Sequence, residues 1–84
     1  MIVLELYPPL EFKNGERKKC LAGRPEGVSA ANLLEEVLQE INSSSGLACR
    51  PEDMLLVVDG RAAGGDFKVM DGQTVKIMLM AMGG

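Results

Sequence analysis

Apolar and polar residues alternate along the first segment of the chain, where every second position of residues 2–6 is Ile or Leu. This period of two is typical of a β-strand with one apolar face. Pro8-Pro9 ends the strand, because proline has no N–H to donate to a sheet. Asn14-Gly15 is a strong tight-turn dipeptide, and residues 17–22 are expected to return as a second strand paired with the first. The charges of this second strand place it near an edge of the sheet.

The clearest helical pattern follows a loop at residues 24–27. Ser29 is placed to cap the helix, because its hydroxyl can accept a hydrogen bond from an unpaired backbone N–H of the first turn. The helix is expected over residues 30–42, where apolar residues recur with the helical period and form one stripe: Leu33, Leu34, Val37, Leu38 and Ile41. Burial of each side chain contributes about 1.5–3 kcal/mol, so the stripe should be the main packing partner of a sheet. Polar residues take the opposite side and are expected to face solvent: Glu35, Glu36, Gln39, Glu40 and Asn42.

Further strand segments follow the helix. Residues 54–58 form a nearly continuous apolar run, as expected of a central strand that the helix covers on one side. Asp59-Gly60 is the best hairpin dipeptide of the chain, and residues 61–63 are expected to form a short return strand. Asp71-Gly72 is a last turn, and residues 74–80 form the final strand. We expect the helical stripe to pack on side chains from three strands: Leu4, Leu6, Val57, Ile77 and Leu79.

The elements therefore occur in the order strand, strand, helix, strand, short strand, strand. So few residues separate them that the helix must lie across one face of a mixed sheet of four to five strands, with the first and last strands side by side in its middle. This α+β arrangement is the β-grasp, or ubiquitin-like, fold. Residues 1–80 are expected to form this single domain, and residues 81–84 a flexible C-terminal Gly-Gly tail.

Length and charge narrow the range of functions. A chain of 84 residues has room for one core, and an enzyme with its own substrate cavity is hard to build on it. The net charge is −3, and the only basic cluster, Arg17-Lys18-Lys19, is too short for the basic stripe that nucleic acids require. No apolar run approaches the roughly 20 residues that span a bilayer, and the first residues lack the basic start of a signal peptide. We expect a cytoplasmic protein that is not an enzyme and binds no nucleic acid, membrane or cofactor.

The two cysteines do not have the spacing of a metal site. Cys20 and Cys49 lie far apart in sequence, outside the CxxC pattern of zinc ligands, and no histidine is available to complete such a site. In a chain without an export signal, two reduced thiols are expected in preference to a disulfide.

A methionine pattern marks the end of the final strand. Met78, Met80 and Met82 share one face of an extended chain. Their neighbours have more regular core character and are expected to pack under the helix: Val75, Ile77 and Leu79. The methionines would then lie on the open face of the sheet, where flexible thioethers suit a protein-binding surface. Contact with a partner is therefore favoured over plain packing and over Cu(I) binding, because no Cys or His lies nearby in sequence to complete a copper site.

Gly83-Gly84 follows the final strand within a few residues. A tail without side chains can enter a narrow enzyme channel, and glycine lets another backbone approach closely. Such a tail can bring its carboxylate to ATP and to catalytic groups on another protein. We therefore expect Gly83 and Gly84 to carry the reaction, with a partner supplying the catalysis.

Four segments resemble the MoaD/ThiS family of ubiquitin-like sulfur carriers: GVSAANLLEEV at 27–37, LVVDGR at 56–61, MDGQTV at 70–75 and Gly83-Gly84. In length the chain is similar to the small subunit of molybdopterin synthase. The resemblance implies that a ubiquitin-activating-type enzyme of the MoeB/ThiF kind uses ATP to adenylate the Gly84 carboxylate. The adenylate would then become a thiocarboxylate that donates sulfur in molybdopterin or thiamine thiazole synthesis. The second partner would be the large subunit of molybdopterin synthase or thiazole synthase.

Two other functions use the same features. A ubiquitin-like modifier would be joined to lysines of target proteins through Gly84 by the same activation chemistry. A β-grasp interaction module would bind partners through its surface, and its terminal glycines would be incidental. Sulfur transfer and conjugation need the same tail, so both remain open at this point.

Overall fold

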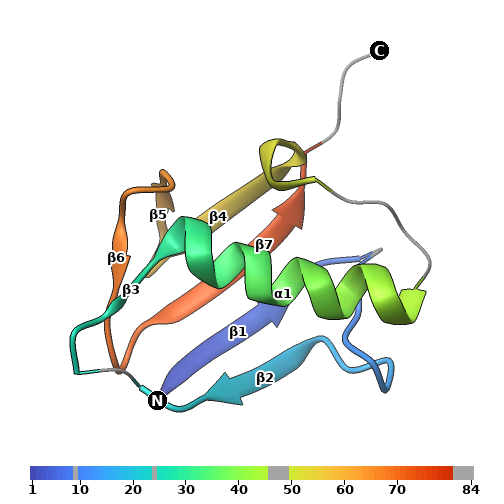
Figure 1. Cartoon of the computed structure of the whole chain (residues 1–84), viewed down its shortest axis with the longest axis horizontal. Coiled ribbons are helices and arrows are strands. Elements are labelled where there is room, and N and C mark those ends of the chain that lie inside the picture. Colours follow the sequence, from blue (N-terminus) through green and yellow to red (C-terminus); the bar gives the residue numbers. More distant parts are fainter. Residues whose placement is uncertain (9, 24, 46–49, 81–84) are drawn as a thin grey trace.

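In the part of the chain that the computed structural model describes, one α-helix crosses one face of a five-stranded sheet (Figure 1). The structure describes residues 1–8, 10–23, 25–45 and 50–80. Its elements in chain order are β1 (Ile2–Leu6), β2 (Lys18–Leu21), β3 (Val28–Ser29), α1 (Ala30–Ser45), the 3-10 helix η1 (Pro51–Asp53), β4 (Met54–Val58), β5 (Arg61–Ala63), β6 (Lys68–Val69) and β7 (Thr74–Leu79). The expected α+β class is confirmed.

The centre of the sheet is a parallel pair formed by the first and last strands. The strand order is β2-β1-β7-β4-β5, in which β1 and β7 are parallel and all other neighbours are antiparallel. Backbone hydrogen bonds continue this pairing at both ends, since Val3 N donates to Gln73 O and Tyr7 N donates to Ile77 O, each at 3.1 Å. The prediction of a mixed sheet with the first and last strands side by side is confirmed.

Both predicted hairpin turns are present. Gly15 has a φ of 77° in the turn before β2. Asp59 and Gly60 have φ of 49° and 85°, which is the left-handed pair that a tight two-residue hairpin requires. The Asp59 side chain helps to hold this backbone, because Oδ1 accepts a hydrogen bond from Thr74 N and Oδ2 accepts one from Gln73 Nε2, each at 3.1 Å. The β4–β5 hairpin is thereby tied to the start of β7.

The helix begins as predicted and ends later. Ser29 Oγ accepts a hydrogen bond from Asn32 N at 3.2 Å, which confirms the predicted cap. α1 continues to Ser45 instead of ending near Asn42. The extra residues are serines, which are only weakly unfavourable in a helix and do not stop it as glycine or proline does. No helix formed by the described residues is long and apolar enough to cross a membrane.

The sequence pattern does not predict the small second sheet formed by β3 and β6. Val28 pairs with Val69 and Ser29 with Lys68, and strands of two residues are too short to show alternation. The pair still belongs to the core, because the Val69 side chain is fully buried. It anchors the segment before α1 to the segment before β7.

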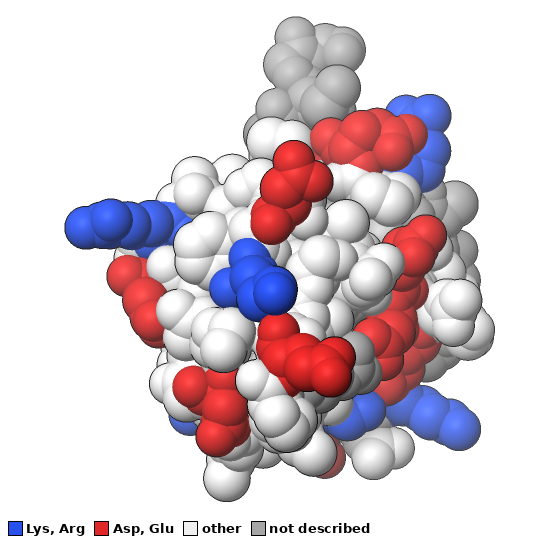
Figure 2. Space-filling model, turned by 60° about the vertical axis from the view of Figure 1, so that its left-hand side comes forward, with Lys and Arg blue, Asp and Glu red and all other residues white. Residues whose placement is uncertain are grey.

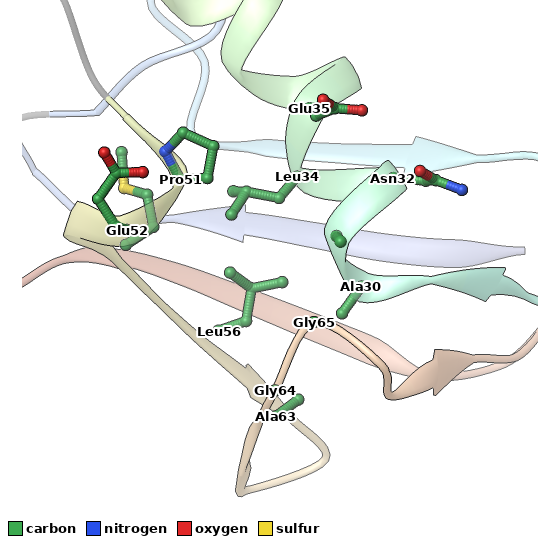
Figure 3. Close-up of a pocket in the computed structure, with 12 residues that line it drawn as sticks. Ala30, Asn32, Leu34, Glu35, Pro51, Glu52, Leu56, Ala63, Gly64 and Gly65 are labelled. Atoms are coloured by element: carbon green, nitrogen blue, oxygen red, sulfur yellow. The ribbon is translucent and has the colours of Figure 1, made fainter.

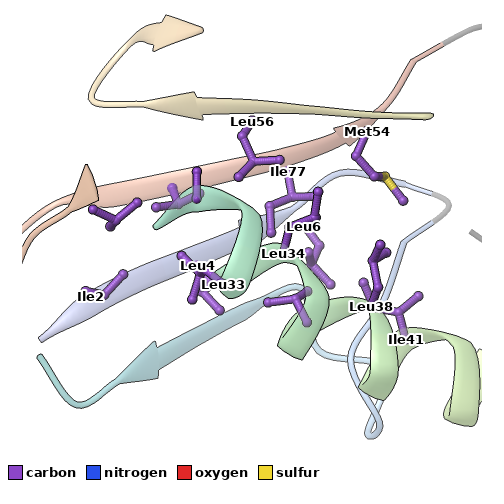
Figure 4. Close-up of a cluster of buried hydrophobic side chains, with 14 of the residues drawn as sticks. Ile2, Leu4, Leu6, Leu33, Leu34, Leu38, Ile41, Met54, Leu56 and Ile77 are labelled. Carbon is purple, nitrogen blue, oxygen red and sulfur yellow. The ribbon is translucent and has the colours of Figure 1, made fainter. Parts of the chain in front are cut away.

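The helix and the sheet share one hydrophobic core (Figure 4). All five residues of the predicted stripe of α1 are buried: Leu33, Leu34, Val37, Leu38 and Ile41. They share the core with alternate residues of the three inner strands: Ile2, Leu4, Leu6, Met54, Leu56, Val58, Val75 and Ile77. Leu10 and Phe12, from the segment between β1 and β2, add two buried side chains that the alternation does not indicate.

Two predicted core contacts are wrong. Val57 is half-buried on the opposite face of the sheet, and Leu56 takes the position under the helix. A continuous apolar run does not show which alternate set faces inward, so the phase of β4 is not readable from its sequence. Leu79 lies on the helix side but is 40% exposed, because it is the last residue of β7 and stands at the end of the sheet.

A charged residue of the edge strand β2 also faces the helix. Lys19 pairs with Leu4 of β1, and its Nζ donates a hydrogen bond to Glu40 Oε1 at 2.8 Å. Lys13 N donates to Glu40 Oε2 at 3.2 Å. The hydrogen bond from Lys19, followed by that from Lys13 N, lowers the pKa of the Glu40 carboxyl below its ordinary value. The ion pair links the edge strand to α1.

Replacement of Leu38 by Ala tests the packing of α1 on the sheet. Leu38 is 5% exposed, so Leu38→Ala should lower the free energy of unfolding by about 2–5 kcal/mol through lost burial and the cavity left behind. Gln39→Ala, on the exposed side of the same turn, should change it by less than about 0.5 kcal/mol. Urea unfolding measures both variants, and equal losses would contradict the assignment of the buried stripe.

Removal of the Lys19 ammonium should raise the Glu40 pKa toward its ordinary value. Lys19→Met keeps the apolar stem of the side chain but loses the hydrogen bond. Because folding lowers the Glu40 pKa, the stability that the pair adds is fully present above the ordinary glutamate pKa and disappears as the pH falls through the lowered one. NMR titration of the Glu40 carboxyl measures the pKa, and urea unfolding at several pH values measures the stability.

The matched control for this ion pair is Lys18→Met. Lys18 pairs with Glu5 and faces the other side of β2, so its replacement should leave the Glu40 pKa unchanged. A Glu40 pKa that is also unmoved by Lys19→Met would mean that the ion pair does not form in solution.

Candidate functional site

The face of the sheet away from α1 is the first candidate site, and we call it the open face. The strand register assigns ten residues to it: Val3, Glu5, Lys18, Cys20, Leu55, Val57, Ala62, Thr74, Lys76 and Met78. Their side chains are exposed or half-buried, whereas the alternate residues of β1, β4 and β7 enter the core. The open face is therefore available to another protein.

A row of charged residues crosses the middle of the open face. Glu5 of β1 lies between Lys18 of β2 and Lys76 of β7 in the register. Lys76 in turn lies beside Val57 of β4. Opposite charges at neighbouring strand positions attract one another. With one acid between two bases, the row presents a net positive strip.

Exposed apolar side chains gather beyond this row, where β1 and β7 end. Tyr7, Leu79 and Met80 are 40%, 40% and 38% exposed, and we call these three residues the apolar collar. They lie at one edge of the sheet because β1 and β7 are parallel, so that the carboxyl ends of both strands meet there. Met80 N also donates a hydrogen bond to Asp53 O at 2.8 Å, which holds the end of β7 to η1. The collar therefore lies at a fixed point at the end of β7.

Two of the three predicted partner-binding methionines fall in this region. Met78 is half-buried on the open face, where the alternation of the final strand predicts it. Met80 belongs to the apolar collar. The remaining predicted site residues, which belong to the predicted tail at 81–84, lie outside the described residues: Met82, Gly83 and Gly84.

Cys20 lies on β2, and its thiol is exposed and free. Cys49 lies outside the described residues, so the expectation of two reduced thiols stays a prediction. Within the described ranges, no group of three or more His, Cys, Asp or Glu side chains is placed to hold a metal ion.

The charges on the side of the molecule shown in Figure 2 are mixed. Acidic and basic side chains are interspersed there, and the described residues form no continuous basic patch on that side. A surface that follows a phosphate backbone needs such a patch. The expectation that the chain binds no nucleic acid stays a prediction.

A second candidate site is a groove on the helix side of the sheet (Figure 3). It has a volume of about 620 Å³ and lies between the first turns of α1, η1, β4 and the residues just after β5. Its lining is mostly small or apolar and includes Leu34, Met54, Leu56, Ala63, Gly64 and Gly65. Sequence reasoning misses this groove because its walls come from four segments that only the fold brings together. The small residues at the start of α1 and after β5 are the one signal that favours a hollow there.

Comparison of the chain with protein-family models, with curated proteins and with solved structures finds no match. The functional argument therefore rests on the residues themselves and on the geometry of the open face, the collar and the groove.

Proposed function

We propose that this chain is a sulfur carrier of the β-grasp type, in which Gly84 carries the reacting carboxylate. The observation that carries the proposal is the apolar collar at the end of β7, a few residues before Gly83-Gly84. An enzyme that acts on a narrow extension must bind the carrier firmly where that extension begins, because the reaction depends on accurate positioning of the reacting carboxylate. The mixed sheet with a central parallel pair and a helix across one face is compatible with a β-grasp.

The proposed chemistry needs only one reacting group from this chain. A carboxylate oxygen of Gly84 attacks the α-phosphorus of ATP, pyrophosphate leaves, and an acyl-adenylate forms. Hydrosulfide supplied by the partner then attacks the acyl carbon, AMP leaves, and a thiocarboxylate remains. ATP is bound by the activating enzyme, of the MoeB/ThiF type, and not by the carrier. The thiocarboxylate donates its sulfur in molybdopterin or thiamine thiazole synthesis.

The open face supplies the recognition surface in this proposal. Met78 and Met80 carry flexible thioethers, which adapt to differently shaped partners. This property suits a carrier that meets an activating enzyme first and then the large subunit of molybdopterin synthase or thiazole synthase. The charged row of Lys18, Glu5 and Lys76 would orient the partner protein on the open face, because charge complementarity favours one register of docking over others.

Changes in the tail should block activation without affecting stability. Deletion of Gly84 shortens the reach of the carboxylate, whereas Gly83→Val keeps the reach but adds bulk and restricts the backbone. Both variants should abolish ATP–pyrophosphate exchange by the activating enzyme from the same cells. Both should also unfold in urea as the unchanged chain does, because the described core ends at Ile77.

The outcome that would contradict the carrier proposal is normal exchange by a variant that lacks both glycines, which would favour the interaction module. Intact mass of the protein from its own cells separates the other two functions. Sulfur transfer should raise the mass by the difference between one sulfur and one oxygen atom. Conjugation should instead attach the chain through Gly84 to a lysine of another protein.

The collar gives a prediction of its own. Met80→Glu places a charge where the partner is expected to bury an apolar side chain, and it should weaken binding to the activating enzyme by more than about tenfold. Met70→Glu is the matched control, because Met70 is 41% exposed and Met80 38%, but Met70 follows β6 and is not part of the collar. Surface plasmon resonance measures both affinities. Equal weakening by the two variants would count against the collar as the docking point.

A further inference from the structure

The groove on the helix side of the sheet takes no part in the carrier chemistry. Leu34 of α1 and Leu56 of β4 point into it (Figure 3), and Met54 and Ala63 add to its apolar lining. Its volume of about 620 Å³ lies within the range of sites that enclose a small ligand or one or two side chains. The groove is thus a feature distinct from the open face.

The wall that follows β5 keeps the groove open because it consists of glycine. A Cβ on Gly64 would meet no atom within 4 Å, so the space beside this residue is empty. Gly65 lies against the helix, since its Cβ would be 3.4 Å from Ala31 Cβ and its carbonyl accepts a hydrogen bond from Ala31 N at 3.1 Å. The wall is therefore fixed to α1 at Gly65, and the space beside Gly64 is open to a bound side chain.

The charged side chains that line the groove are both acidic. Glu35 on α1 and Glu52 on η1 are exposed. Arg50 Nε lies 3.5 Å from Glu52 Oε1 and 3.3 Å from Asp53 Oδ2, so one cation is shared between two carboxylates. No described cation pairs with Glu35. The rim of the groove therefore carries a net negative charge.

We infer that the groove docks a segment of a partner protein in which leucine-sized apolar side chains are followed by lysine or arginine. An apolar side chain rests on the part of the groove lining that Leu34 and Leu56 form, and the cation lies against the carboxylates of Glu35 and Glu52. A purely apolar segment would bring no cation to this acidic rim, and an acidic segment would be repelled by it. The segment enters on the side of Gly64, where no side chain blocks the way.

A synthetic hexapeptide with two leucines followed by two lysines tests the charge of the occupant. Added to the full chain, it should shift the backbone amide NMR signals of groove residues, above all Leu34, Glu35, Leu56 and Gly64. The same peptide with glutamates in place of the lysines should bind at least about tenfold more weakly. The double variant Glu35→Lys, Glu52→Lys should weaken binding of the lysine peptide by a similar factor, whereas Glu16→Lys, on the hairpin before β2, should not.

A second variant tests the space in the groove. Ala63 pairs with Leu56, so it faces the helix side and lines the groove; Ala63→Leu should therefore narrow the groove, and peptide binding should be lost. Ala62→Leu adds the same bulk to the opposite face of β5 and should bind as the unchanged chain does. Urea unfolding verifies that each variant is folded.

Equal affinity for the lysine and glutamate peptides would overturn the inference. Shifts confined to the open face, or unchanged binding by a folded Ala63→Leu chain, would overturn it as well. None of these results bears on the carrier proposal, because the exchange assay measures activation of the Gly84 carboxylate, whereas these experiments measure peptide binding by the groove residues.

Discussion

The parallel pairing of β1 with β7 is the constraint on which the rest of the structure depends. Parallel strands cannot be joined by a tight turn, so the chain between Leu6 and Thr74 must supply the edge hairpin, the helix and the β4–β5 hairpin before it returns to the centre. The pairing also sets the direction in which β7 runs across the sheet. If β7 ran antiparallel to β1, it would end beside Met1, away from Tyr7, and the apolar collar would not exist.

Elements with strong local signals are predictable from the sequence because each depends only on neighbouring residues. The alternation in β1 and the helical period of the stripe reflect chain geometry directly. Asp59-Gly60 forms its turn because both residues tolerate left-handed φ, which most side chains resist. Ser29 caps α1 for an equally local reason, since its hydroxyl reaches the N–H of Asn32.

Features that arise between distant segments are not predictable in the same way. β4 is apolar at every position, and only its pairing with β7 shows that Leu56 and not Val57 faces the helix. The β3–β6 sheet is too short to leave a pattern. The open face and the methionines on it follow from the alternation of β7. The groove cannot be predicted from such a pattern, because Gly64 lines a groove only when the fold brings α1 beside it.

The collar lies at the end of β7 and the groove lies on the helix side of the sheet, yet both involve one element. Asp53 O of η1 accepts the hydrogen bond from Met80 N, and Glu52 of the same turn lines the groove. A protein docked in the groove would leave the open face uncovered, so the proposed activating enzyme and the proposed groove partner would not compete for that face. A partner that stayed in the groove while the carrier passed from one enzyme to the next would raise the effective concentration of the carrier at its acceptor. If the carrier proposal and the docking proposal both hold, this division of surfaces would let a chain with a single small core bind two proteins at a time.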